Sequence, residues 1–227
     1  MRIYSTIKYL FKESMGSSYE YDSHMDNLFS LVFKHLHSFR PVNFLDVGCG
    51  DGSRTVRLAQ YLGIDAAHTY GVDNREGLIT NECAKLFHAK RIDLEMETLP
   101  YGENAFDLVV CNQVLEHLKN YDKVIHDIIR VTRTGGYIMI GIPNLAHLIN
   151  RIYLLFGIQP MCIAINSQHV CGFTHKDFEK MLRSLPKVKF IDCAGSAIIY
   201  PLPLLLSKHL SKFFVGICGY VCYLMRK

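Results

Sequence analysis

Residues 44–53, FLDVGCGDGS, carry the pattern in this chain that most clearly indicates chemistry. An apolar run leads into Asp46, and Gly48, Gly50 and Gly52 follow at alternate positions. Glycines at this spacing let the backbone turn sharply at the carboxyl end of a strand and approach a ligand closely. A helix that follows the turn would point its amide groups at the ligand. The segment predicts a nucleotide-type cofactor pocket, although flavin, nicotinamide and adenosyl cofactors and a purely structural turn all suit it.

Polar residues at the ends of later apolar runs extend the predicted pocket. Asp73 ends a run about 20 residues further on, where a doubly wound sheet places an acid against ribose hydroxyls. Asp93 could bind cofactor or merely cap the next turn, and Asn112 could bind cofactor or satisfy backbone groups at its strand end. The candidate cofactor-binding residues all lie at or near a predicted strand end: Asp46, Gly48, Cys49, Gly50, Asp73, Asn74, Asp93, Leu94, Asn112 and Gln113.

The elements that must position these residues alternate along the middle of the chain. Strands are predicted at 42–47, 68–73, 89–93, 106–111 and 136–142, and helices at 53–62, 76–87 and 120–132. Such alternation implies a parallel sheet with right-handed crossovers, whose ligands bind at the carboxyl ends of the strands.

Further elements are predicted on both sides of this core. Residues 25–39 have the apolar periodicity of a helix, and residues 145–157 predict a helix that is apolar nearly all round. Thr174 can cap another helix. Residues 203–214 predict an amphipathic helix that leads to a last strand at 219–227.

The ordered segments LDVGCGDG, GVD, FDLVVCNQVLEHL and GGYIMIGIPN resemble the motifs of the class I S-adenosylmethionine-dependent methyltransferases, in particular the group that acts on small molecules, glycans and quinones. The resemblance implies an α/β, Rossmann-like, doubly wound fold. Its sheet would have seven strands, mostly parallel with an antiparallel last strand, and helices on both faces. The resemblance also implies S-adenosyl-L-methionine as the cofactor.

A single methyltransferase domain over residues 1–227 is expected from this resemblance. Its parts would be an N-terminal helical lid (1–40), a cofactor-binding core (41–142), an acceptor-side insertion (143–175) and an apolar, basic C-terminal region (176–227).

The resemblance gives the candidate cofactor residues separate roles. Asp46, Gly48 and Gly50 would surround the methionine portion and Asp73 would hold the ribose. Asp93 and Leu94 would lie at the adenine, with Asn112 or Gln113 near the methionine side.

Two histidines are candidate catalytic residues. Methyl transfer mainly requires an acceptor aligned with the sulfonium methyl group, but a hydroxyl acceptor must also lose a proton. Histidine is a natural base because its ordinary pKa lies near neutral pH. His117, in VLEHL, and His169, in HVCGFT, are the two candidates, while His117 could equally orient its helix or bond to loop backbone.

No metal is expected from the sequence. Some quinone-biosynthetic O-methyltransferases with an EVLEH motif are associated with a divalent cation through its two glutamates and its histidine, and this chain has Gln113 at the first glutamate position. An amide there removes a hard anionic ligand. Cysteines and histidines between 162 and 175 match no common zinc spacing, and the eight cysteines include no CxxC pair. Reduced thiols are expected.

Composition indicates a globular protein with 49% hydrophobic and 20% charged residues and a net charge of +4. From Arg183 onwards seven Lys or Arg residues and one acid lie among long apolar runs, a pattern that suggests peripheral contact with a membrane surface. The periodicity of residues 203–214 alone favours the alternative, a helix that faces the core before the last strand. The N-terminus lacks the features of a secretory signal, so a cytoplasmic protein is expected. No basic stripe with stacking aromatics predicts a nucleic-acid partner.

Together these features predict methyl transfer from S-adenosylmethionine to a small-molecule, glycan or lipid-linked acceptor, at oxygen. The alternative is a non-catalytic S-adenosylmethionine-binding module or partner subunit, in which the pocket is kept and acceptor chemistry is absent. The oligomeric state is left open.

Overall fold

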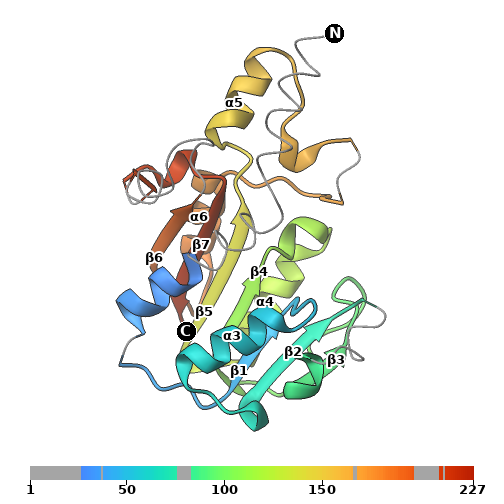
Figure 1. Cartoon of the computed structure of the whole chain (residues 1–227), viewed down its shortest axis with the longest axis vertical. Helices are drawn as coiled ribbons and strands as arrows, with labels where there is room; N and C mark the ends of the chain where they lie inside the picture. Colours follow the sequence, from blue (N-terminus) through green and yellow to red (C-terminus); the bar gives the residue numbers. More distant parts are fainter. Residues whose placement is uncertain (1–26, 37, 76–82, 166–167, 197–209, 212) are drawn as a thin grey trace.

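A seven-stranded sheet forms the centre of the computed structural model, which describes residues 27–36, 38–75, 83–165, 168–196, 210–211 and 213–227 (Figure 1). The strands, in chain order, are β1 (Phe44–Val47), β2 (Thr69–Asp73), β3 (His88–Arg91), β4 (Phe106–Asn112), β5 (Thr132–Pro143), β6 (Lys189–Ser196) and β7 (Tyr220–Arg226).

The order of the strands across the sheet is β3-β2-β1-β4-β5-β7-β6. Parallel pairing joins β3 through β5, while β7 runs antiparallel to both β5 and β6. The order reverses direction between β1 and β4, so the carboxyl ends of these two strands form the switch point where a doubly wound sheet binds ligands. The predicted Rossmann-like fold with an antiparallel last strand is confirmed.

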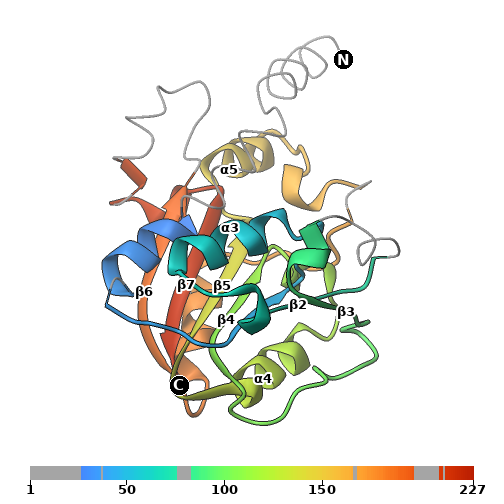
Figure 2. The same ribbon diagram turned by 60° about the horizontal axis from the view of Figure 1, so that its bottom comes forward.

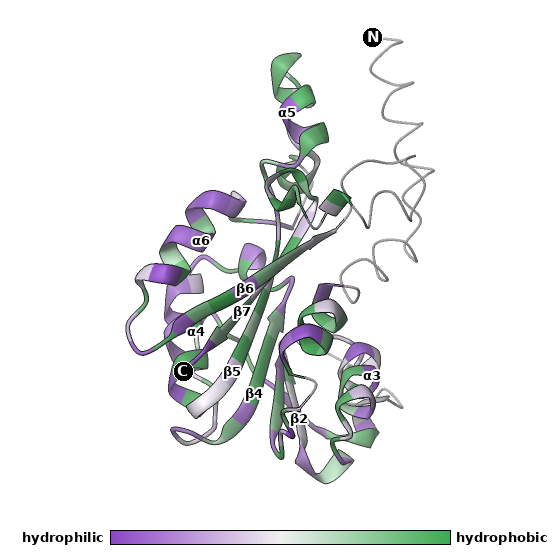
Figure 3. Ribbon diagram, turned by 90° about the vertical axis from the view of Figure 1, so that its left-hand side faces the viewer, coloured by the Kyte–Doolittle hydropathy of each residue, from purple (hydrophilic) through white to green (hydrophobic). Residues whose placement is uncertain are grey.

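Helices cover both faces of the sheet (Figures 2 and 3). One face carries a helix over 27–35 and α3 (Ser53–Leu62), and the other carries α4 (Tyr121–Val131) and α6 (His175–Ser184). The remaining helix, α5 (Leu148–Leu155), projects beyond the carboxyl end of β5 (Figure 1). Short 3₁₀ turns join the elements: η1 (Ala66–His68), η3 (Cys83–Leu86), η4 (Leu115–His117), η5 (Met161–Ile163) and η6 (Val215–Ile217).

Alternation along the strands explains why two hydrophobic layers form. Successive side chains of a strand point to opposite faces. On β4, Val109 packs with the α4 and α6 layer, while Leu108 and Val110 pack with the 27–35 and α3 layer. All three side chains are buried, because helices cover both faces of a central strand.

Most predicted elements are present, with shifted ends. The helix expected at 76–87 lies largely outside the described residues, and its described part is the 3₁₀ turn η3. β5 begins at Thr132 rather than at 136. Thr174 caps α6 as predicted, its hydroxyl accepting the Asp177 N–H. The amphipathic helix expected at 203–214 falls mostly outside the described residues, as does the lid before residue 27.

The end of α5 is apolar and exposed. Leu154, Leu155 and Phe156 are 58%, 83% and 76% exposed, and hydrophobic residues dominate the outer end of this projecting helix (Figure 3). Among the described residues, no helix has the length and apolar character needed to span a bilayer. The end of α5 is therefore an exposed apolar surface on a helix that is too short to cross a bilayer.

Candidate active site

The turn after β1 brings the ends of three strands together. The N–H groups of Gly48 and Cys49 both donate to the carbonyl of Val72 on β2, at 2.8 and 3.1 Å. Gly48 has φ +78°, and a Cβ added there would lie 2.1 Å from the Val114 side chain, which follows β4. Only glycine combines this conformation with so close a neighbour. The turn therefore fixes β1 against both β2 and the segment after β4.

A carboxylate at the end of β2 holds the second half of this turn. Asp73 accepts the Gly50 N–H at 2.9 Å through one oxygen and the Arg75 N–H at 3.0 Å through the other. The predicted ribose-binding acid thus lies directly beside the glycine turn. Its carboxylate also keeps acceptor capacity, because each oxygen has more than one lone-pair direction.

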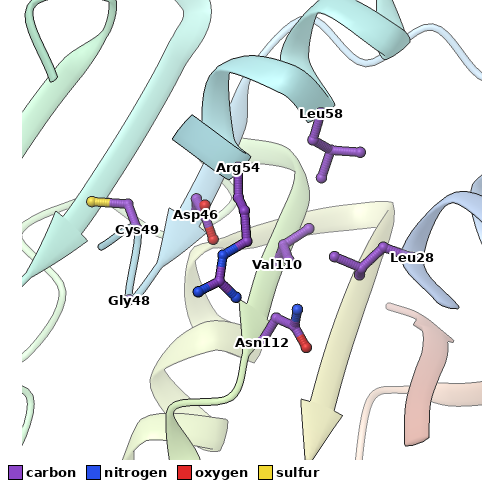
Figure 4. Close-up of a pocket in the computed structure, with 8 residues that line it drawn as sticks. All are labelled: Leu28, Asp46, Gly48, Cys49, Arg54, Leu58, Val110 and Asn112. Carbon is purple, nitrogen blue, oxygen red and sulfur yellow. The ribbon is translucent and has the colours of Figure 1, made fainter. Parts of the chain in front are cut away.

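A small pocket opens between β1, β4 and α3 (Figure 4). Its volume is about 20 Å³, enough for one small polar group, so it can take only one end of a larger cofactor. Its lining residues come from β1 and the turn after it, from β4, from α3 and from the helix over 27–35: Leu28, Asp46, Gly48, Cys49, Arg54, Leu58, Val110 and Asn112.

Asp46 and Arg54 bring opposite charges into this pocket (Figure 4). Asp46 is 8% exposed and accepts a 2.6 Å hydrogen bond from the Thr55 hydroxyl. Burial raises the pKa of Asp46 to about 6, against the opposing effects of the Thr55 hydrogen bond and the nearby Arg54 charge. Burial deprives the Asp46 carboxylate of solvating water. A cationic ligand group beside it would stabilise the charged form instead.

Asn112 at the end of β4 carries a buried donor that is not used. Its Nδ2 has no hydrogen-bond partner among the described residues, although the residue lines the pocket. A Cβ on Gly141 would lie 1.9 Å from Asn112 Oδ1, so this glycine makes room for the amide. Buried polar groups are nearly always paired, and this donor therefore indicates a ligand acceptor in the pocket.

Gln113 directly follows Asn112 in a rarely adopted backbone conformation. Its φ is +59°, and its N–H donates to Gly141 at 2.9 Å. Non-glycine residues in this region store strain, and they cluster at functional sites.

The remaining predicted cofactor residues lie further out along the ends of β2 and β3. Asn74 is exposed and accepts Arg91 Nε through its carbonyl. Asp93 is exposed and accepts the Glu95 N–H at 3.0 Å, so one of its oxygens does cap the next turn. Leu94 is buried. The Ile92 N–H donates to the Asp73 carbonyl, which brings the end of β3 to the end of β2.

The two predicted catalytic histidines lie side by side, although 52 positions separate them in the chain. The rings of His117 and His169 meet edge to face with centroids 4.7 Å apart. His117 Nδ1 lies 3.2 Å from the Gln168 carbonyl, and His169 Nδ1 lies 2.5 Å from the Cys162 carbonyl. Because a carbonyl can only accept, each Nδ1 is the donor in these contacts.

Glu116 lies against this histidine pair and is fully buried. Its Oε1 is 4.0 Å from His117 Nε2, and neither carboxylate oxygen has a hydrogen-bond partner among the described residues. Burial raises the pKa of Glu116 to about 8. The backbone N–H groups of Val170 and Cys171 donate to the Glu116 carbonyl, which holds the segment with His169 over η4.

Sequence reasoning gave no role to Arg54, Thr55 or Glu116 at the site. Arg54 and Thr55 open the helix after the glycine turn, a position that could have suggested them. Glu116 lies in the VLEHL segment beside His117, but its burial at the site is not readable from the sequence. The cysteine and histidine cluster between 162 and 175 separates in the structure, because His169 joins Glu116 while His175 joins Glu179 and Cys193.

Comparisons with known proteins agree with this geometry. Residues 45–140 match a family model described as a methyltransferase domain. A demethylmenaquinone methyltransferase of Shouchella clausii is 31% identical over 100 residues, which cover 42% of each chain. The hybrid PKS-NRPS synthetase poxE of Penicillium oxalicum is 26% identical over 174 residues, 68% of this chain. The chain spans 4% of that synthetase and less than half of the methyltransferase.

Solved structures show the same fold. A SAM-dependent methyltransferase from Archaeoglobus fulgidus superposes with a TM-score of 0.59 at 17% identity, covering 97% of this chain and 99% of that one. The sheet and its covering helices are therefore those of the class I methyltransferase fold.

We expect Gly48→Ala to destabilise the protein more than Gly50→Ala. Both positions have positive φ, which costs an alanine about 1–2 kcal/mol, but only the Cβ at 48 collides with Val114 and adds about 1–3 kcal/mol of overpacking. Urea unfolding of both variants measures the difference. Adding Val114→Ala to Gly48→Ala should recover part of the loss, and equal losses for the two single variants would contradict the assigned contact.

We expect Asp46→Asn to stabilise the protein at pH 8 while weakening binding of S-adenosylmethionine. The folded-state pKa of about 6 lies above the ordinary 3.8, so the stabilisation from Asp46 is present below pH 4 and lost as the pH rises through 6. The variant should gain up to about 3 kcal/mol in free energy of unfolding at pH 8 and nothing near pH 4. Urea unfolding at both pH values and calorimetry with the cofactor measure this, and a pH-independent difference would contradict it.

Proposed function

We propose that this chain transfers the methyl group of S-adenosylmethionine to a hydroxyl oxygen of a small-molecule, glycan or lipid-linked acceptor, because residues 45–140 match a methyltransferase-domain family model and the sheet has the class I methyltransferase fold. The observation that carries the proposal is the presence of two groups of polar residues at or after the carboxyl end of β4. One is the charged pocket with its unused Asn112 donor, and the other is the pair of histidine bases.

The pocket suits the amino-acid end of the cofactor. That end carries an ammonium and a carboxylate, and the pocket offers the Asp46 carboxylate and the Arg54 guanidinium. Asn112 Nδ2 can donate to a cofactor oxygen and so gain its missing partner. Asp73, beside the turn, is then placed for the ribose, in keeping with an acid at the end of the second strand. Asp93 and Leu94 remain our candidates for the adenine end.

The histidine pair supports transfer to oxygen. His117 follows Val114, the residue next to Gly48, by three positions in the chain, and His169 lies against His117. When the acceptor oxygen attacks the sulfonium methyl group, the carbon–sulfur bond breaks and its electron pair stays on sulfur. The hydroxyl proton leaves to His117 or His169, directly or through a group that they hold. S-adenosylhomocysteine and a methyl ether are the products.

We expect His117→Gln and His169→Gln to lower kcat by about 100-fold or more while leaving the affinity for S-adenosylmethionine unchanged, because neither side chain lines the cofactor pocket. Release of S-adenosylhomocysteine with a panel of phenolic, glycan and lipid-linked hydroxyl acceptors measures the first effect, and calorimetry measures the second. His126→Gln, an exposed histidine on α4, is the matched control. Cofactor binding without turnover of any acceptor would instead favour the non-catalytic binding module.

We also propose that the protein works at the cytoplasmic surface of a membrane, which would suit a lipid-linked acceptor. The exposed apolar end of α5 and the basic, apolar C-terminal sequence support this. Co-sedimentation with vesicles containing anionic lipid should fall several-fold for Leu155→Ser/Phe156→Ser relative to the exposed control Tyr61→Ser. Equal sedimentation of the two variants, or no sedimentation of the parent protein, would overturn the proposal.

A further inference from the structure

Glu116 is an anomaly that the methyltransferase chemistry leaves unexplained. It is fully buried, and neither of its carboxyl oxygens has a hydrogen-bond partner in the part of the chain that the structure describes. Buried polar groups in native proteins are nearly always paired, so such a group calls for a water or an ion. The side chains next to it belong to His117 and His169. We infer that Glu116, His117 and His169 together bind one divalent transition-metal ion.

The three side chains come close enough to share an ion. One ligand atom from each lies within 4.8 Å of the others, and Glu116 Oε1 is 4.0 Å from His117 Nε2. Bonds of about 2.0–2.2 Å hold the ligands of one ion closer together than this, so binding would draw the three side chains inward. The His117 side chain is 38% exposed, which gives an ion a route from solvent to the buried carboxylate.

The hydrogen bonds around the histidines are those of metal ligands. In known sites a ligating histidine almost always donates its second ring N–H to a carbonyl or carboxylate, which fixes the ring and its tautomer. Here both Nδ1 atoms lie against backbone carbonyls, of Gln168 and Cys162, so each ring donates through Nδ1 as metal-ligating histidines do. This support is independent of the unpaired carboxylate.

The donor set also selects the type of ion. Two imidazole nitrogens and one carboxylate favour zinc or a neighbouring first-row metal over magnesium or calcium, which prefer oxygen ligands. The sequence expectation of no metal depended on Gln113, which lacks the carboxylate of the quinone-enzyme motif. The structure supplies a different third ligand, His169, from a segment folded back over η4.

Three protein ligands leave a fourth position open, as in catalytic zinc sites. This position could take the acceptor hydroxyl oxygen and make its proton easier to lose, so that the histidines act through the ion. This part rests on the proposed function, whereas ion binding does not.

A second cluster, His175, Glu179 and Cys193, is a weaker candidate. Glu179 there already forms a 2.7 Å ion pair with Arg183, and His175 Nδ1 is 3.1 Å from the Tyr223 hydroxyl. A nearby guanidinium opposes a cation, and hydrogen bonds already account for the polar groups.

Cobalt substitution tests the inference. Protein freed of metal by a chelator is titrated with Co²⁺, and visible absorption together with calorimetry should report one ion per chain. Glu116→Gln and His169→Gln should each weaken binding by at least about 10-fold, the loss that even an outer-shell change produces. His126→Gln and Cys193→Ser should bind like the parent protein.

Three outcomes would overturn the inference: no stoichiometric binding by the folded chain, binding unchanged by Glu116→Gln, or binding lost in Cys193→Ser. Calorimetry with S-adenosylmethionine on the same metal-free samples shows that the variants are folded. The same measurement separates the two proposals. A chain that binds S-adenosylmethionine but no Co²⁺ contradicts only this inference, and a chain that binds Co²⁺ but no S-adenosylmethionine contradicts only the proposed function.

Discussion

The left-handed turn at Gly48 is the constraint on which the rest of the site depends. It lets two successive N–H groups reach the Val72 carbonyl, and it leaves no space for a side chain against Val114. The ends of β1, β2 and the segment after β4 are thereby held together at the switch point of the sheet. The positions of those ends also determine where the nearby polar residues lie. Asp46 comes just before the turn, and Glu116 and His117 come just after Val114.

Two buried carboxylates show how binding chemistry opposes stability in this fold. Asp46 and Glu116 both lie where burial disfavours their charged forms, and their pKa values are raised to about 6 and about 8. A domain optimised for stability alone would use neutral residues at these positions. Such groups are typical of functional sites, where a ligand supplies the missing counter-charge.

The acceptor side is made by long-range contacts. The segment that carries His169 returns to η4 and donates two backbone hydrogen bonds to the Glu116 carbonyl. Cys162 and Gln168, from the same region, orient the two imidazoles. One returning segment therefore places His169 beside His117 and packs over η4.

The sheet and the cofactor loop could be predicted from the sequence, because both depend on local patterns. Short apolar runs, the glycines after β1 and the acid after β2 are each readable within a few residues. Local patterns were less informative at two places. Residues 83–86 form a 3₁₀ turn where a helix was expected, and β5 begins at Thr132 rather than at 136. Three features of the site could not be read from the sequence: Arg54 lines the pocket, His117 lies against His169, and buried Glu116 has no side-chain hydrogen-bond partner among the described residues. Those facts depend on which distant segments pack together, and burial and pKa follow from that packing rather than from sequence spacing.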